Sequence, residues 1–131
     1  MKMLKIIISA LTLLLVAGCS TSQPVMNMTN SLVPANLSEQ EISRAIINAG
    51  VSKTWIMREE RPGLITGHIQ VRQHQANISI PYNTTNYSIN YVSSVNLNDK
   101  GKGKIHRTYN RWINGLNQEI QLELKRASSN K

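Results

Sequence analysis

Histidines and carboxylates are the residues of this chain best suited to metal or acid–base chemistry, but their spacing favours neither. There are three histidines, His68, His74 and His106, and seven acidic residues. His68 and His74 fall on one face of a predicted strand, but they are roughly 20 Å apart along it and cannot share a metal ion. No His-x-Glu or His-Glu-x-x-His pattern supports zinc hydrolysis. We therefore expect no metal site and no cofactor.

Serine chemistry has no stronger signal. The sequence contains no Gly-x-Ser-x-Gly pattern, in which a strained turn exposes a nucleophilic serine. A Ser/His/Asp set assembles in space, however, so one sequence does not exclude it. We expect no catalytic residue and no enzymatic activity. A small periplasmic hydrolase that uses His74 or His106 remains the alternative.

Positive charge is the more prominent chemical feature. The chain has 15 Lys and Arg against 7 Asp and Glu, a formal net charge of +8. Lys100, Lys102 and Lys104 alternate with glycines, and Arg107 follows shortly after. The segment lacks the P-loop pattern, and a solvated loop is the simpler interpretation. Concentrated cations nevertheless suit acidic protein surfaces or lipopolysaccharide phosphates, so these four residues are candidate partner-binding residues.

Cys19, the only cysteine, ends a segment typical of secretion signals. Two lysines precede an eleven-residue apolar run, 6–16, and small residues Ala17 and Gly18 follow it. A basic start, a short apolar region and a small-residue cleavage site describe a signal peptide. The run is too short for a membrane-spanning helix, which needs roughly 20 residues. We predict that residues 1–18 are a signal peptide.

Leu15-Val16-Ala17-Gly18-Cys19 resembles the lipobox of bacterial lipoproteins. The resemblance implies that Cys19 is the lipid attachment site, linked to diacylglycerol and N-acylated after cleavage, and several acyl chains anchor stably. Ser20, where an Asp would favour the inner membrane, implies the outer membrane. We expect the protein to be lipid-anchored there and to face the periplasm, a compartment in which nucleic acid is not an expected partner.

The segments Arg72-Gln73-His74, Ile89-Asn90-Tyr91 and Ile105 to Trp112 also resemble those of small proteobacterial lipoproteins with no assigned activity. This resemblance implies the same localisation and supplies no functional residues.

Composition divides the remaining chain in two. Residues 19–35 are rich in Ser, Thr, Asn, Gln and Pro without an apolar period, which predicts a lipidated flexible tether. About 16 such residues would reach roughly 20–25 Å. Residues 36–131 then form a single small domain. Without residues 1–18 the chain keeps 13 basic and 7 acidic residues, a net charge of +6.

Two amphipathic helices flank this domain. Ser38 and Glu41 form a capping-box pattern, with Leu37 and Ile42 at the positions of a hydrophobic staple. Gly50 suits the residue that ends this helix. The second helix is predicted from about residue 106 to residue 126, with an apolar stripe at Tyr109, Trp112, Ile113, Leu116, Ile120 and Leu124.

Four strands with alternating apolar residues are predicted between the helices, at residues 54–60, 64–74, 76–82 and 87–97. Their short connections favour an antiparallel meander. The last strand is expected to keep Tyr87, Ile89, Tyr91, Ser93, Val95 and Leu97 on one face.

These elements predict an α+β fold of two layers, α-β-β-β-β-α, in which both helices pack on one face of a four-stranded antiparallel sheet. The other face is left open, and we expect it to be polar and partly basic. Arg58, His68, Arg72 and His74 are its candidate partner-binding residues. The function hypothesis is a non-enzymatic binding or structural module for an envelope protein or an anionic glycolipid.

Overall fold

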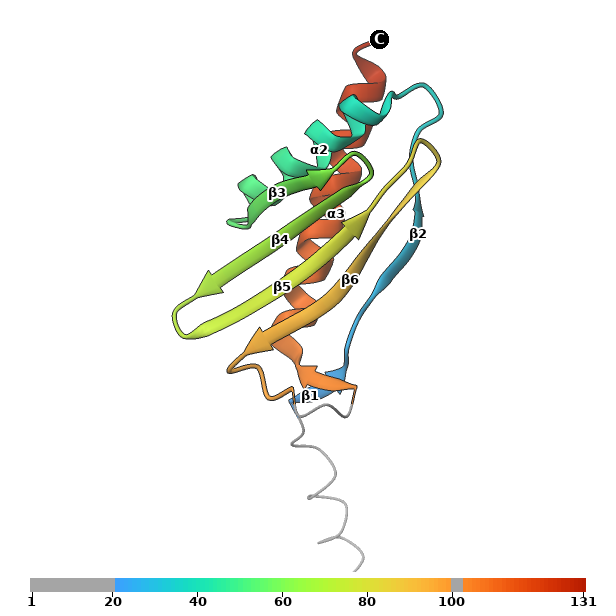
Figure 1. The fold of residues 1–131 in the computed structure, drawn as a ribbon. Helices are drawn as coiled ribbons and strands as arrows, with labels where there is room; N and C mark the ends of the chain where they lie inside the picture. The colour runs from blue at the N-terminus through green and yellow to red at the C-terminus, as the bar shows by residue number, and fades with distance from the viewer. Residues whose placement is uncertain (1–20, 100–102) are drawn as a thin grey trace, which may run out of the picture.

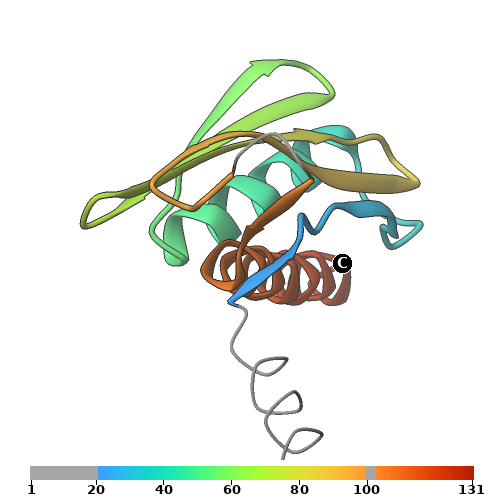
Figure 2. The ribbon, with the colours of Figure 1, turned by 90° about the horizontal axis from the view of Figure 1, so that it is seen from below.

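The computed structural model describes residues 21–99 and 103–131. Two helices, α2 (Glu39–Ser52) and α3 (Arg107–Ser129), lie on the same side of an antiparallel sheet (Figures 1 and 2). The strands are β1 (Ser22–Pro24), β2 (Met28–Leu32), β3 (Ile56–Arg61), β4 (Leu64–Val71), β5 (His74–Pro81), β6 (Asn86–Val95) and β7 (Lys104–His106). The predicted α+β fold is confirmed.

The main sheet has five strands in the order β2-β6-β5-β4-β3. Its β3-β4-β5-β6 part is the predicted antiparallel meander. Two additions correct the prediction of four strands: β2 pairs with the outer edge of β6, and β1 pairs with β7 in a separate two-stranded sheet. β1 and β2 come from the segment before α2, whereas β7 directly precedes α3.

That segment is therefore folded from residue 21 onward, and the prediction of a flexible tether over residues 19–35 is wrong for its described part. Its backbone hydrogen-bonds to distant residues: Val25 N–H donates to the Gly103 carbonyl at 2.9 Å, and Val33 N–H to the Thr85 carbonyl at 3.0 Å. Polar strands of this kind lack an apolar period because they lie at sheet edges and gain their order from main-chain pairing.

Asn110, on α3, holds the chain between the two added strands. Its side-chain Oδ1 accepts from Met26 N–H at 2.9 Å, and its Nδ2 donates to the Pro24 carbonyl at 2.9 Å and to Gln23 Oε1 at 3.2 Å. Asn110 is buried, with 5% of its surface exposed. One amide thus satisfies two backbone groups in and after β1, the Pro24 carbonyl and Met26 N–H.

The start of α2 is as predicted, and its end is not. Ser38 Oγ accepts from Glu41 N–H, and Glu41 Oε1 accepts from Ser38 N–H, both at 3.2 Å. Gly50 was expected to end the helix, but α2 continues to Ser52. Gly50 instead lets β3 approach, because a Cβ there would lie 2.3 Å from the Met57 side chain.

A β-bulge changes which side chains of β6 point to the buried face of the sheet. Asn77 pairs with Ser93 and Ile78 with Tyr91, which leaves Val92 as an extra residue. Such an insertion reverses the alternation beyond it. Val95, predicted on the buried face, is 48% exposed on the opposite one.

The core lies between the sheet and the two helices. Helix α3 supplies Tyr109, Ile113, Leu116, Ile120 and Leu124, all fully buried. Tyr109 packs edge-on against Tyr91, with ring centroids 5.3 Å apart. Burial raises the pKa of the Tyr109 phenol well above its ordinary value, so this side chain is a neutral core residue.

Candidate functional site

No element of the described chain covers the sheet face opposite the helices (Figure 2). A polar network crosses this face. His68 Nδ1 lies 2.7 Å from Asn77 Oδ1, and Asn77 Nδ2 donates to Ser93 Oγ at 2.9 Å. These side chains share a register row across β4, β5 and β6, so the pleat alone places them side by side.

Arg58 and His68, both predicted on the open face, are found there. They line a shallow hollow of about 360 Å³. Glu60, on the same strand as Arg58, accepts from Thr66 Oγ1 at 2.9 Å and lies 3.7 Å from the Arg58 guanidinium. The charge of Arg58 is therefore partly compensated, and the face is less basic than expected.

Two aliphatic side chains, Ile56 and Val92, border the same hollow. Ile56 is 71% exposed and Val92 is 57% exposed. Val95 lies further along this face, beside Gln75. Val92 points outward by the regular alternation after Tyr91, and the bulge turns Val95 outward as well, so a face expected to be polar carries an apolar component. We call Ile56, Val92, His68 and Asn77 the open-face site.

Arg72 and His74 lie in and beside the β4–β5 turn, away from the open-face site. Arg72 has a positive φ of 56°, a backbone position set by the tight turn. His74 Nδ1 lies 2.8 Å from the Asn96 carbonyl, and Asn96 Nδ2 donates to the Gln73 carbonyl at 2.9 Å. His74 therefore links the turn to the end of β6.

The predicted basic segment is only partly described. Lys100 and Lys102 lie outside the described residues, as does the predicted lipid attachment site, Cys19. Lys104 is in β7 and Arg107 is the first residue of α3, and both are exposed. The structure thus separates the predicted partner-binding residues into the open face, the β4–β5 turn and the β7–α3 junction.

The remaining histidine, His106, caps α3. Its Nδ1 accepts from Thr108 N–H at 3.2 Å. Within the described chain, no three His, Cys, Asp or Glu side chains are close enough together to hold a metal ion.

Glu59 accepts hydrogen bonds from two side-chain hydroxyl groups. Tyr82 hydroxyl donates to its Oε1 at 2.6 Å, and Ser43 Oγ donates at 2.8 Å. The Tyr82 hydrogen bond, followed by that of Ser43, lowers the pKa of Glu59 below its ordinary value of 4.5. Both donors favour the ionised form, so Glu59 accepts hydrogen bonds that tie α2 to the sheet.

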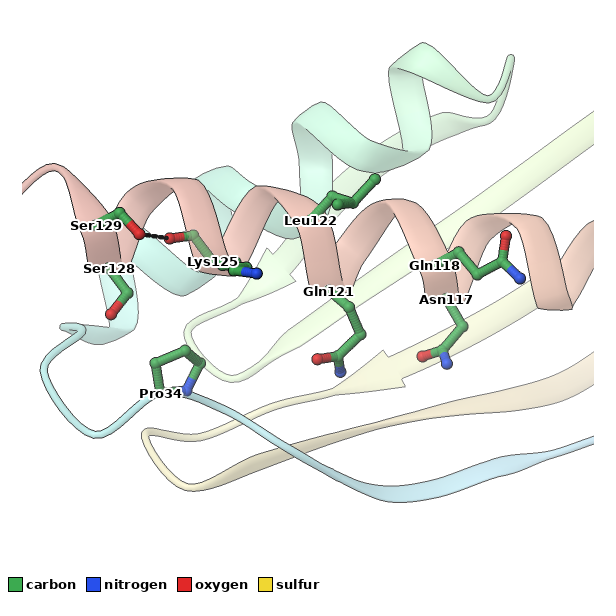
Figure 3. A pocket seen from close by; sticks show the side chains of 8 residues that line it. All are labelled: Pro34, Asn117, Gln118, Gln121, Leu122, Lys125, Ser128 and Ser129. Carbon is green, nitrogen blue, oxygen red and sulfur yellow. Dashed lines mark hydrogen bonds between the residues drawn. The ribbon is translucent and has the colours of Figure 1, made fainter.

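A second hollow, of about 640 Å³, lies along α3 beside the end of β2 (Figure 3). Behind it, Tyr87 hydroxyl donates to Asn117 Oδ1 at 2.5 Å and accepts from Gln121 Nε2 at 2.7 Å. Its lining residues are Pro34, Asn117, Gln118, Gln121, Leu122, Lys125, Ser128 and Ser129. This hollow was not predicted, because Pro34 belongs to the segment predicted as a tether. The amides Asn117, Gln118 and Gln121 on α3 are a local signal that could have indicated it.

The described helices include none that is both long and apolar enough to cross a membrane. Comparisons of this chain with protein-family models, curated proteins and solved structures gave no match.

Proposed function

We propose that this protein is an outer-membrane lipoprotein, anchored through acylated Cys19, whose periplasmic domain binds an envelope protein through the open-face site without catalysis. The lipobox at residues 15–19 and the preceding apolar run support the anchor. The exposed pair Ile56 and Val92, beside a cross-strand polar network, is the observation that carries the binding role.

The composition of this surface is that of a recognition site. Aliphatic side chains exposed together favour burial against a partner, and hydrogen-bonding groups around them set orientation. His68 and Asn77 satisfy each other in the free protein, so they keep their positions without a partner. Complete burial of an aliphatic side chain contributes about 1.5–3 kcal/mol, which makes the pair the expected energetic centre.

Site-specific crosslinking in intact cells tests the binding role. A photoreactive amino acid at Thr66, which lines the hollow, should capture one defined envelope protein, identified by mass spectrometry. The double variant I56D/V92D should reduce the capture at least about tenfold, because two aliphatic contacts are replaced by charges.

The matched control is V51D/L122D, which places two aspartates at exposed aliphatic positions on the helices, 61% and 47% exposed. This control should leave capture unchanged. Equal loss in both double variants, or loss in the control alone, would move the binding site away from the open face.

The anchor has a separate test. The mass of the purified native protein should correspond to a chain that begins at an acylated Cys19. An intact N-terminal methionine with an unmodified thiol would refute the anchor and leave the binding role to be judged by crosslinking.

A further inference from the structure

The first described residues, which are next to the predicted anchor in the sequence, are part of the fold. The Thr21 carbonyl accepts from Arg107 N–H at 3.0 Å, and Ser22 pairs with His106 in the small sheet. Thr21 is two residues after Cys19, so these two Cα atoms are separated by at most about 7–8 Å of chain. A domain anchored through Cys19 is therefore held with this end at the membrane surface.

The buried amide of Asn110 strengthens this placement. It binds Gln23, Pro24 and Met26, the residues that follow Thr21 and Ser22. Figure 1 shows β1 at one end of the molecule and the C-terminus at the other. The anchored end is thus a fixed part of the fold, and its side chains have a defined position relative to the lipid headgroups.

Cations without acidic partners gather at this end. Lys104, Arg107 and Arg111 are exposed, and within the described residues none of them forms an ion pair. Elsewhere, by contrast, Arg126 and Lys131 pair with glutamates at 2.7 and 2.6 Å. The first turn of α3 contains no acidic residue.

Two of these cations border a hollow of about 230 Å³, lined by Gln23, Met26, Arg107, Asn110, Arg111 and Asn114. The planar guanidinium group binds phosphate oxygens through paired N–H donors. Gln23 and Asn114 add amide groups that can donate to the remaining oxygens. The size of the hollow and its hydrogen-bond donors suit a phosphate group, and the open side leaves room for the rest of a larger molecule.

We propose that this hollow binds the phosphate of an anionic phospholipid in the membrane leaflet that holds the anchor, with Arg107 and Arg111 as its main ligands. The proposal rests on the proposed lipid anchor, which brings the hollow to the headgroups. In this proposal the positive charge serves membrane binding, whereas the open-face site binds an envelope protein.

A titration of the purified full chain in neutral maltoside micelles tests the assignment. The probe is dihexanoylphosphatidylglycerol, and the readout is the NMR shift of the Asn114 side-chain amide and the arginine Nε–H groups. Each arginine near anionic lipid contributes about 1 kcal/mol, so R107Q/R111Q should weaken binding about 30-fold. The matched control R44Q/R61Q removes equal charge elsewhere and should weaken binding less than about threefold.

Two further arms identify the source of the phosphate. Dihexanoylphosphatidylcholine should bind far more weakly, because its choline offsets the phosphate charge, and inorganic phosphate should also bind weakly. Inorganic phosphate that binds as tightly as phosphatidylglycerol would refute the membrane assignment. Equal binding of both lipids, or equal weakening in both double variants, would refute the site.

The variant R111K keeps the positive charge but removes the planar guanidinium group with its paired N–H donors. It tests phosphate recognition if R107Q/R111Q does not fold. It should weaken binding measurably, by less than the about fivefold expected for loss of one whole arginine; wild-type affinity in R111K would refute phosphate recognition by a guanidinium group. Neither measurement depends on Ile56 or Val92, so failure here is separate from failure of the crosslinking experiment.

Discussion

Replacing Asn110 with alanine should release residues 23–26 from α3. The substitution removes three hydrogen bonds, two of them to the backbone of Pro24 and Met26. A buried backbone group left without a partner costs about 1–3 kcal/mol. Because this segment can open to water and regain hydrogen bonds there, we expect a loss of about 2–4 kcal/mol in the free energy of unfolding.

Urea unfolding measures the overall loss, and hydrogen exchange measures where it occurs. Met26 N–H, which donates to Asn110 Oδ1 at 2.9 Å, should lose its protection in N110A. The amide of Ile78, in the centre of the main sheet, should keep most of its protection because a typical domain has 5–15 kcal/mol of stability.

Asn114→Ala is the matched control, one turn further along α3. Asn114 is exposed, so its replacement should change stability by no more than about 0.5 kcal/mol. The reasoning is refuted if N110A retains both its stability and the protection of Met26, or if N114A is equally destabilised. Either result would mean that the buried amide does not hold the segment.

Three further predictions concern the scaffold. Ser38→Ala removes the helix cap and should cost about 1 kcal/mol in urea unfolding, with Ser38→Asp close to wild type. Gly67→Ala should lower the melting temperature, because the new Cβ would lie 2.9 Å from the Ile78 side chain. The lowered pKa of Glu59 means that its stabilisation, through Tyr82 above all, is present above pH 4.5 and is lost as pH falls below it. Thermal unfolding between about pH 6 and pH 3 should therefore depend less on pH in E59Q.

Features set by neighbouring residues were predictable from the sequence. The capping box at Ser38 needs only the next three residues, and the strand Leu64–Val71 shows its buried face through alternation. The α+β class followed because the apolar faces of two helices and a sheet have to cover one another.

Features set by distant partners were not predictable. β1 pairs with β7 across about 80 residues of sequence, and neither strand has an apolar period. The bulge at Val92 results from the pairing with β5, and the residues of β6 alone do not indicate it. One local signal was present: Asn110 follows Tyr109 on the apolar side of α3, and a buried amide needs partners to satisfy it.

The ordered segment before α2 changes what the proposed anchor can do. A tether of roughly 20–25 Å would let the domain turn freely, and its charge would then act only through long-range attraction. Because Thr21 is already hydrogen-bonded to Arg107, the proposed anchor would keep Arg107 and Arg111 near the membrane surface. The open-face site lies on strands β3 to β6 rather than at the end of the molecule that carries β1 (Figure 1). The two proposed sites therefore occupy different surfaces, and occupation of one would leave the other accessible.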